Sequence, residues 1–185
     1  MLKKSRWKKR LAWHLFDRRL LKGAGIIHAL SEAERDAMAL TFPDMRDRIQ
    51  VIPNGVAIPR IPASNEPTHN VSPRLELLFL SRIARIKGVF ELLDSWRRIE
   101  HQFPHWRLKF VGPVAPDISS TFKAALAECR NAVHAGVAHG DERWSHYRSA
   151  AAFVLPSHAE GLPTALLEAA SFALTILTTR EANFP

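Results

Sequence analysis

Residues 151–168 read AAFVLPSHAEGLPTALLE, and this stretch decides the fold of the chain. Its first five residues form an apolar run that is typical of a buried strand. From Pro163 onward the pattern is helical, and proline is favoured in the first turn of a helix. The stretch therefore predicts a strand, then a loop that carries Glu160, then a helix that carries Glu168 about a turn and a half from its start.

The predicted start of this helix favours binding of a phosphate or of hydroxyl groups. The amides of Leu162, Thr164 and Ala165 belong to the donors that a helix leaves unpaired at its start. Gly161 allows a sharp turn and the close approach of a ligand. A carboxylate accepts hydrogen bonds in pairs, so two glutamates beside such a start suit a polyol such as a sugar or a ribose. The alternative is that each acid only caps the helix and offsets its dipole.

Strands and helices alternate after residue 73. Apolar runs typical of strands lie at residues 75–80, 106–111, 132–135, 151–155 and 174–178. Helical patterns lie between them, at residues 89–101, 118–130, 142–150 and 163–172. This alternation predicts an α/β fold, with a Rossmann-like and mostly parallel sheet and helices on both faces. Because crossovers in such a sheet are right-handed, all strand-to-helix loops lie at its carboxyl edge, where ligands bind.

A second motif follows the first of these strands and reads SRIARIKG, at residues 81–88. Arg82 and Lys87 flank this loop. A guanidinium binds phosphate oxygens through two hydrogen bonds and an ammonium adds a mobile charge, so the pair favours a diphosphate at the same edge of the sheet. Arg85 is expected to be solvated. The alternative is that all three cations are solvated surface groups.

Other positions narrow the function further. Gly112 follows the second strand on the same edge, where its missing side chain is expected to leave room for a ligand. The chain has no Gly-x-Gly-x-x-Gly and no Walker loop, which disfavours dinucleotide redox chemistry and ATP hydrolysis. The nine histidines are scattered, so no metal site and no cofactor are predicted. Cys129, the single cysteine, excludes an internal disulfide and is expected to be a buried structural thiol.

The first 22 residues carry nine lysines and arginines and one aspartate, which accounts for the whole net charge of +8. A helix over residues 5–22, packed on two sides by a larger protein, is the favoured interpretation. Contact of residues 1–22 with the cytoplasmic membrane face is an alternative. Specific binding of nucleic acid is disfavoured because no reader module is present. The chain has neither a membrane-spanning apolar run nor a secretory signal pattern, so a cytoplasmic protein is expected.

The segment before residue 57 predicts a small α/β unit. A strand is expected at residues 26–30, followed by a helix to about Leu40 that Ser31 and Glu34 begin as a capping box, and a second strand at residues 49–52. Four prolines space out polar residues at positions 57–73, which predicts a semi-rigid linker and a domain boundary.

Together these segments resemble glycosyltransferase family 4. The resemblance rests on VIPNGV at residues 51–56, on Arg82 and Lys87, on FVG at residues 110–112, and on residues 155–169 with their two glutamates. Members of this family are retaining enzymes with two Rossmann-like halves, the GT-B fold, and no metal requirement. The resemblance implies that residues 74–185 are the donor-binding half, that residues 1–56 are the end of the acceptor-binding half, and that both ends of the fold are cut.

The resemblance also implies a role for each candidate residue. Arg82 and Lys87 would bind the donor diphosphate, Glu160 the hydroxyls of the donor sugar, and Glu168 the ribose. The remaining implied contacts to the donor are Gly112, Gly161, Leu162 and Thr164, and the implied catalytic residues are Glu160, Arg82 and Lys87.

The expected function is transfer of a hexose from a nucleotide-diphosphate sugar to a glycan or lipid-linked acceptor, with retention of anomeric configuration. An alternative is a non-catalytic nucleotide-sugar-binding fragment or subunit that needs a separate acceptor domain. The base, the sugar and the acceptor are not defined by the sequence. One departure from the family lies after the second glutamate, where Ala173 and Thr175 stand in place of the usual glycine and proline. The turn there is therefore expected to be less well specified.

Overall fold

The structure is a computed structural model that describes residues 18–56, 75–182 and 184. The chain divides into two compact units, Met1–Asn54 and Gly55–Pro185. The linker predicted at residues 57–73 and most of the basic N-terminal segment lie outside the described residues. Within the part that is described, no helix combines the length and the hydrophobicity needed to cross a membrane.

The first unit is a two-stranded parallel sheet with its connecting helices. Its elements are α2 (Arg18–Gly23), β1 (Ile27–Ala29), α3 (Glu32–Thr41), a 3-10 helix (Pro43–Arg48) and β2 (Ile49–Val51). The hydroxyl of Ser31 accepts the amide of Glu34 at 3.2 Å, which confirms the predicted cap. The carboxylate of Glu34 accepts the amide of Leu30 at 2.6 Å, one residue earlier than a capping box requires. The 3-10 helix was not predicted.

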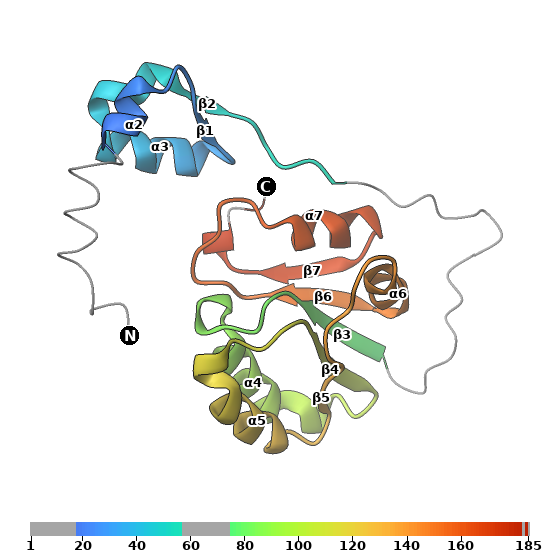
Figure 1. The fold of residues 1–185 in the computed structure, drawn as a ribbon. Coiled ribbons are helices and arrows are strands. Elements are labelled where there is room, and N and C mark those ends of the chain that lie inside the picture. Colours follow the sequence, from blue (N-terminus) through green and yellow to red (C-terminus); the bar gives the residue numbers. More distant parts are fainter. Residues whose placement is uncertain (1–17, 57–74, 183, 185) are drawn as a thin grey trace. The chain divides into compact units, whose positions relative to one another are not determined.

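The second unit contains five parallel strands in the order β5-β4-β3-β6-β7 (Figure 1). The strands are β3 (Leu75–Leu80), β4 (Trp106–Val111), β5 (Ala132–His134), β6 (Ala152–Leu155) and β7 (Thr175–Thr178). The helices are α4 (Val89–Ile99), α5 (Ser119–Ala127), α6 (Glu142–Ser149) and α7 (Thr164–Ser171). The predicted α/β fold with a parallel sheet is confirmed.

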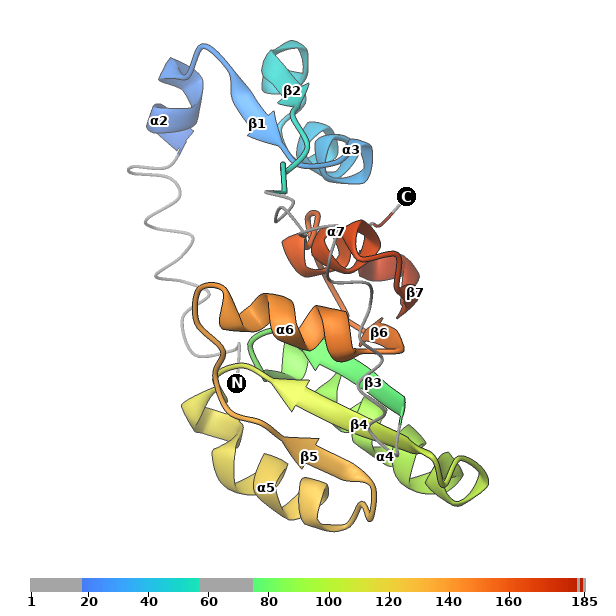
Figure 2. The ribbon, with the colours of Figure 1, turned by 90° about the vertical axis from the view of Figure 1, so that its right-hand side faces the viewer.

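The strand order decides which face each helix covers. From β3 the chain moves outward to β4 and β5, then returns to β6 and β7 on the other side. Right-handed crossovers in opposite directions place α4 and α5 on one face of the sheet and α6 and α7 on the other (Figure 2). All five carboxyl ends lie at one edge, and the strand order reverses beside β3.

Aromatic side chains fill the core on both faces. On one face Phe110 packs between Phe79 and Phe122, with ring centroids 5.1 and 5.4 Å apart. On the other face Tyr147 packs against Phe153 and Phe172, at 5.7 and 5.5 Å. Burying each such ring stabilises the fold by about 2–3 kcal/mol, so these contacts fix the helices on the sheet.

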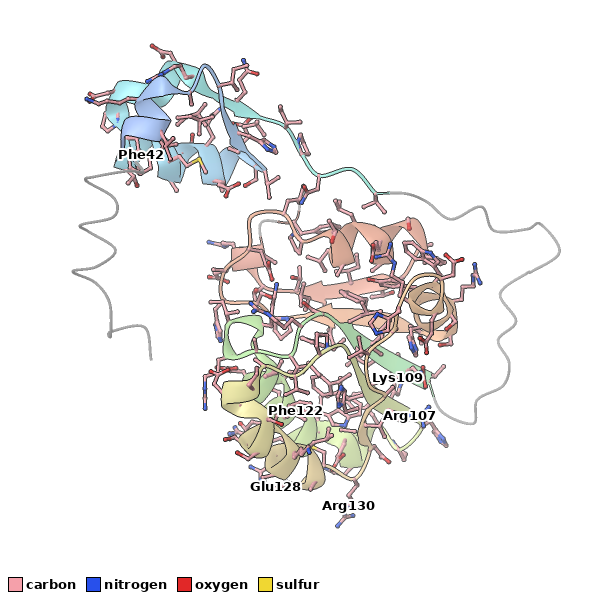
Figure 3. The ribbon with its side chains drawn as sticks, in the orientation of Figure 1. Phe42, Arg107, Lys109, Phe122, Glu128 and Arg130 are labelled. Atoms are coloured by element: carbon pink, nitrogen blue, oxygen red, sulfur yellow. The ribbon has the colours of Figure 1, made fainter. Side chains whose placement is uncertain are left out.

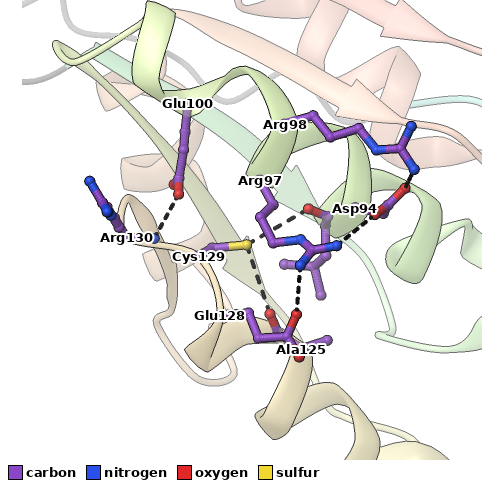
Figure 4. A network of polar contacts seen from close by, with 9 residues as sticks. Asp94, Arg97, Arg98, Glu100, Ala125, Glu128, Cys129 and Arg130 are labelled. Carbon is purple, nitrogen blue, oxygen red and sulfur yellow. Dashed lines mark hydrogen bonds and ion pairs between the residues drawn. The ribbon is translucent and has the colours of Figure 1, made fainter.

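The end of α4 is held by a buried glutamate. Ile99, the last residue of α4, is 40% exposed, and the chain continues into a 3-10 turn that begins at Glu100. The carboxylate of Glu100 accepts a hydrogen bond from the amide of Arg130 at 3.0 Å (Figure 4) and another from the amide of Asn131 at 2.9 Å. Cys129 is buried beside this turn, as predicted, and burial raises the pKa of its thiol.

A second buried acid lies near the amino ends of the strands. Glu76 on β3 is 4% exposed, forms an ion pair with Arg107, and accepts the ammonium of Lys109 at 3.0 Å. Arg107 and Lys109 both project from β4, and Arg107 is the register partner of Glu76 (Figure 3). Burial raises the pKa of Glu76, but the hydrogen bonds and charges of the two cations outweigh it and hold that pKa below its usual value.

We predict that Glu76→Gln destabilises the second unit by about 3 kcal/mol at neutral pH, because it leaves two cations without their shared anion. A lowered folded-state pKa contributes stability that is complete above the unfolded pKa of about 4.3 and is lost as the pH falls through the folded pKa. The difference between wild type and variant in urea unfolding should therefore shrink below about pH 4. Glu128→Gln, a control at an exposed ion pair with Arg97, should leave stability nearly unchanged. A Glu76→Gln cost that is independent of pH would contradict this account.

The turn between α7 and β7 keeps a glycine-like conformation without glycine. Ala173 has a φ of 55°, in the left-handed region, and its amide donates to the carbonyl of Ala170 at 2.9 Å. Leu174 donates to the carbonyl of Ala169 at 3.2 Å, so the turn still closes the helix. These hydrogen bonds define the turn, and Ala173 bears the strain of a left-handed conformation at the position where the family usually has glycine.

We predict that Ala173→Gly stabilises the second unit by about 1 kcal/mol, because glycine adopts a positive φ without the steric cost that alanine bears. Urea unfolding measures the change. Ala124→Gly, at an exposed position inside α5, is the matched control and should destabilise by about 0.5–1 kcal/mol. Destabilisation by both substitutions would contradict the left-handed conformation at Ala173.

Candidate functional site

Loops from three neighbouring strands form the candidate site. Residues 81–88 follow β3, residues 112–118 follow β4, and residues 156–163 follow β6. Because β3 pairs with both β4 and β6, its loop lies between the other two at the carboxyl edge. This is the point where the strand order reverses, and open α/β sheets bind their ligands at such points.

Gly112 brings the first two loops together. It has a φ of 137°, and a Cβ at this position would lie 2.1 Å from the carbonyl oxygen of Ser81. Ile83 then donates to the carbonyl of Pro113 at 2.9 Å. The room that was expected for a ligand beside Gly112 is filled by the Ser81 carbonyl, so that interpretation was wrong. The close approach of two loops explains this glycine, and donor contact at Gly112 stays a prediction.

Gly88 brings the loop after β3 against the loop after β6. It has a φ of 69°, and a Cβ here would lie 2.0 Å from the carbonyl oxygen of Pro156. The amide of His158 donates to the carbonyl of Ile86 at 2.9 Å, which adds a second link between the loops. These contacts fix the position of Lys87 relative to the loop that carries Glu160.

Lys87 and Glu160 form an ion pair across these two loops. Their side chains are 17% and 12% exposed, so the pair is largely shielded from water and stronger than a surface pair. The hydroxyl of Ser157 donates to the same carboxylate oxygen at 2.6 Å, and the amide of Glu160 donates to the carbonyl of Glu181 at 3.0 Å. Ser157 is fully buried, and the sequence analysis missed it. The sequence does show a serine three residues before Glu160, a spacing at which its hydroxyl can reach the carboxylate.

Arg82 and Arg85 differ in their surroundings, although both are exposed. Arg85 is exposed, as expected, and its guanidinium also lies 4.8 Å from the centre of the Phe90 ring, a cation–π contact. Within the described part of the chain, the structure gives the Arg82 side chain no hydrogen bond and no ion pair. Arg82 is therefore available to an anion at the carboxyl edge.

Glu168 lies on the second turn of α7 and is buried. The hydroxyl of Tyr147 donates to its Oε2 at 2.8 Å, and Nη1 of Arg143 lies 3.3 Å from its Oε1. Helical side chains lean toward the N-terminus, so this carboxylate lies toward the first turn of α7. Tyr147 and Arg143 come from α6 and were not singled out in the sequence, because the pattern at residues 142–150 is unremarkable.

The family Glycosyl transferases group 1 matches residues 74–185, more than half of the chain. The chain belongs to this family. The five-stranded parallel sheet with helices on both faces is therefore the C-terminal domain of the GT-B fold, and the described part of the first unit adds a small two-stranded parallel sheet.

Relatives support this assignment at low sequence identity. The putative teichuronic acid biosynthesis glycosyltransferase TuaC of Bacillus subtilis (strain 168) is 26% identical over 170 residues, which are 88% of this chain and 40% of that protein. TarM of S. aureus superimposes with a TM-score of 0.72 at 15% identity, over 88% of this chain and 32% of TarM. The C-terminal domain of the group 1 protein LpcC from Francisella tularensis gives a TM-score of 0.59 at 22% identity, over 71% of this chain and 73% of that domain. The chain spans less than half the length of the curated relatives that it matches.

The start of α7 completes the site of this group 1 glycosyltransferase domain. Pro163 is the N-cap, one position earlier than predicted, and it supplies no side-chain cap. The first turn contains no acidic residue, so no carboxylate of that turn offsets the partial positive charge of the helix end. Thr164 is exposed at this start, whereas Leu162 is buried. The backbone of this turn is suited to an anion.

The structure brings two of the four predicted charged residues into direct contact, Lys87 and Glu160. Arg82 lies on the same loop as Lys87, and Glu168 lies on the second turn of the helix that follows the Glu160 loop. Within residues 18–56, 75–182 and 184, no group of three histidine, cysteine, aspartate or glutamate side chains is arranged to hold a metal ion.

We predict that Gly88→Ala destabilises the second unit by about 2 kcal/mol or more, because alanine must bear both a positive φ and a clash with the Pro156 carbonyl. Thermal unfolding measures the loss. Gly140→Ala is the matched control, since Gly140 has a φ of 50° with open space around it, and it should cost only about 1 kcal/mol. Equal losses in the two variants would show that the contact between the loops contributes little.

Proposed function

We propose that this chain binds a nucleotide-diphosphate sugar at the carboxyl edge of its second unit, and that the sugar is transferred to an acceptor with retention of anomeric configuration. The observation that carries the proposal is the shielded Lys87–Glu160 pair, with the available Arg82 on the same loop and the uncapped start of α7 beside it. Cations and backbone amides suit a diphosphate, and carboxylates suit hydroxyl groups.

Lys87 links the two parts of the proposed donor. An ammonium has three N–H donors, so Lys87 can keep its bond to Glu160 and still donate to a phosphate oxygen. Ser157 and Lys87 both hold Oε1 of Glu160, which fixes the direction of the carboxylate. In this proposal Glu160 binds the hydroxyls of the sugar, and Lys87 and Arg82 bind the diphosphate next to it.

The proposed chemistry needs stabilisation of a leaving group. The bond between the anomeric carbon and the diphosphate oxygen breaks, and the acceptor oxygen bonds to the same face of that carbon. The departing phosphate takes the proton of the acceptor hydroxyl. Arg82, Lys87 and the start of α7 stabilise the charge that develops on the diphosphate, and such electrostatic stabilisation is commonly the largest catalytic contribution.

The relatives narrow the proposed substrates. The TarM structure is described as a complex with UDP and alpha-GlcNAc-glycerol, and the name of the B. subtilis relative refers to teichuronic acid biosynthesis. We therefore propose a hexosyl donor such as a UDP-sugar and a glycan or lipid-linked acceptor. Residues 74–185 would form the donor domain and residues 1–56 would belong to the other half of the enzyme.

A second candidate is a chain that binds the nucleotide sugar and needs a separate acceptor domain for transfer. Within the described residues, only the second unit carries a five-stranded sheet, and the proposed donor site lies on that sheet. Transfer of sugar by the isolated chain would exclude it. Binding without transfer, restored to transfer when an acceptor domain is added, would support it.

We predict that Arg82→Ala weakens binding of UDP or GDP by about 10-fold or more, because one charge-assisted contact to phosphate contributes about 1.5–3 kcal/mol. Isothermal titration of both diphosphates against wild type and variant measures the loss. Arg85→Ala, on the same loop but stacked on Phe90, is the matched control and should bind like wild type. Equal affinity of wild type and Arg82→Ala, or no binding by wild type, would count against the proposal.

A further inference from the structure

Tyr147 and Glu168 form a buried contact between α6 and α7. Tyr147 is fully buried, Glu168 is 7% exposed, and the tyrosine hydroxyl donates to Oε2 at 2.8 Å. The ring of Tyr147 is held by three aromatic neighbours: Trp144 at 6.1 Å, Phe153 at 5.7 Å and Phe172 at 5.5 Å. The ring therefore cannot move independently of the core, and the direction of its hydroxyl is fixed.

The two oxygens of the Glu168 carboxylate have different partners. Oε2 is held by the buried hydroxyl of Tyr147, whereas Oε1 lies 3.3 Å from the guanidinium of Arg143, whose side chain is 41% exposed. A long contact to an exposed side chain is weak, so the tyrosine bond decides the orientation of the carboxylate.

The direction of proton donation is also fixed. Burial, together with the neighbouring charge of Glu168 and the hydrogen bond to it, raises the pKa of the Tyr147 hydroxyl well above its usual value. The hydroxyl stays protonated at neutral pH and acts as a donor. Each carboxylate oxygen has two lone pairs, so Oε2 can accept one further hydrogen bond while it holds Tyr147.

We propose that Tyr147 is a positioning residue that orients the Glu168 carboxylate toward the vicinal 2′ and 3′ hydroxyls of the donor ribose. The proposal rests on the proposed function, in which Glu168 binds the ribose. A vicinal diol pairs with a carboxylate only when the carboxylate plane is aligned with both hydroxyls. A glutamate held in place by Tyr147 has already lost the side-chain freedom that binding would otherwise remove.

This role makes discrimination between ribonucleotides and 2′-deoxyribonucleotides depend on Tyr147. The loss of one hydroxyl removes half of the diol contact, but it leaves the diphosphate contacts at Arg82 and Lys87 unchanged. A residue that only stabilised the fold would affect both kinds of nucleotide equally. The ratio of the two affinities therefore separates positioning from general stabilisation.

Isothermal titration of the 185-residue chain with UDP, 2′-deoxy-UDP, GDP and 2′-deoxy-GDP tests the proposal. Tyr147→Phe keeps the aromatic packing and removes the hydroxyl. We expect it to weaken binding of the ribonucleotide by roughly five-fold and binding of the 2′-deoxyribonucleotide by less than two-fold.

Two controls separate this effect from general destabilisation. In a chain that already carries Glu168→Gln, Tyr147→Phe should leave the ratio of ribonucleotide to 2′-deoxyribonucleotide affinity unchanged. Trp96→Phe is the matched control, since it removes a buried donor to the Asn131 carbonyl on α4, across the sheet, and should not change the ratio.

A spectroscopic readout does not depend on the stability of a variant. Tyr147 is the single tyrosine of the chain, so biosynthetic 3-fluorotyrosine gives one ¹⁹F resonance that reports on this hydroxyl. We expect this resonance to shift on addition of UDP or GDP and to shift less with the matching 2′-deoxy compound.

Two outcomes would overturn the proposal, and they are distinguishable. In the first outcome, both kinds of nucleotide bind wild type, Tyr147→Phe weakens their binding by equal factors, and both shift the ¹⁹F resonance equally. Tyr147 then has no positioning role, and the proposed function stands. If wild type binds none of the four diphosphates, both the positioning role and the proposed function are wrong.

Discussion

The close contact between Gly88 and Pro156 is the constraint on which the rest of the site depends. It seats the loop after β3 on the loop after β6 with no space for a side chain between them. The Lys87–Glu160 ion pair spans this junction, and the hydrogen bond from His158 to Ile86 reinforces it. A lysine carries a long flexible stem, so without a fixed loop its charge would not have a defined position. The glycine thus sets the geometry of the charges.

The sheet topology explains why this junction lies where a ligand can reach it. β3 pairs with β4 on one side and with β6 on the other, and the helices that follow them lie on opposite faces. The loops after β3 and β6 therefore meet at the carboxyl edge, at the point where the strand order reverses. The aromatic contacts of Tyr147 and Phe172 join α6 to α7 on one of those faces, so the same packing that stabilises the domain also holds Glu168.

The two ends of the strands use charge in different ways. At the amino end Glu76 is buried and forms ion pairs with Arg107 and Lys109, whose side chains are 32% and 15% exposed. At the carboxyl end Lys87 and Glu160 are paired but partly accessible, and Arg82 is exposed. The exposure of the paired side chains does not separate these two clusters. Their position does, because the loops where open α/β sheets bind ligands lie at the carboxyl edge.

The sequence by itself determined the alternation of strands and helices, the parallel sheet, the cap at Ser31 and the edge at which the candidate residues gather, because these follow from short-range periodicity and from general rules of chain topology. Only the tertiary structure decided the reason for Gly112, the exposure of Ile99, and the partners of Glu160 and Glu168. Lys87 and Glu160 are 73 residues apart in the chain, and Tyr147 and Glu168 are 21 apart. Such contacts depend on how helices and loops pack on the sheet, and short-range sequence patterns do not predict that packing.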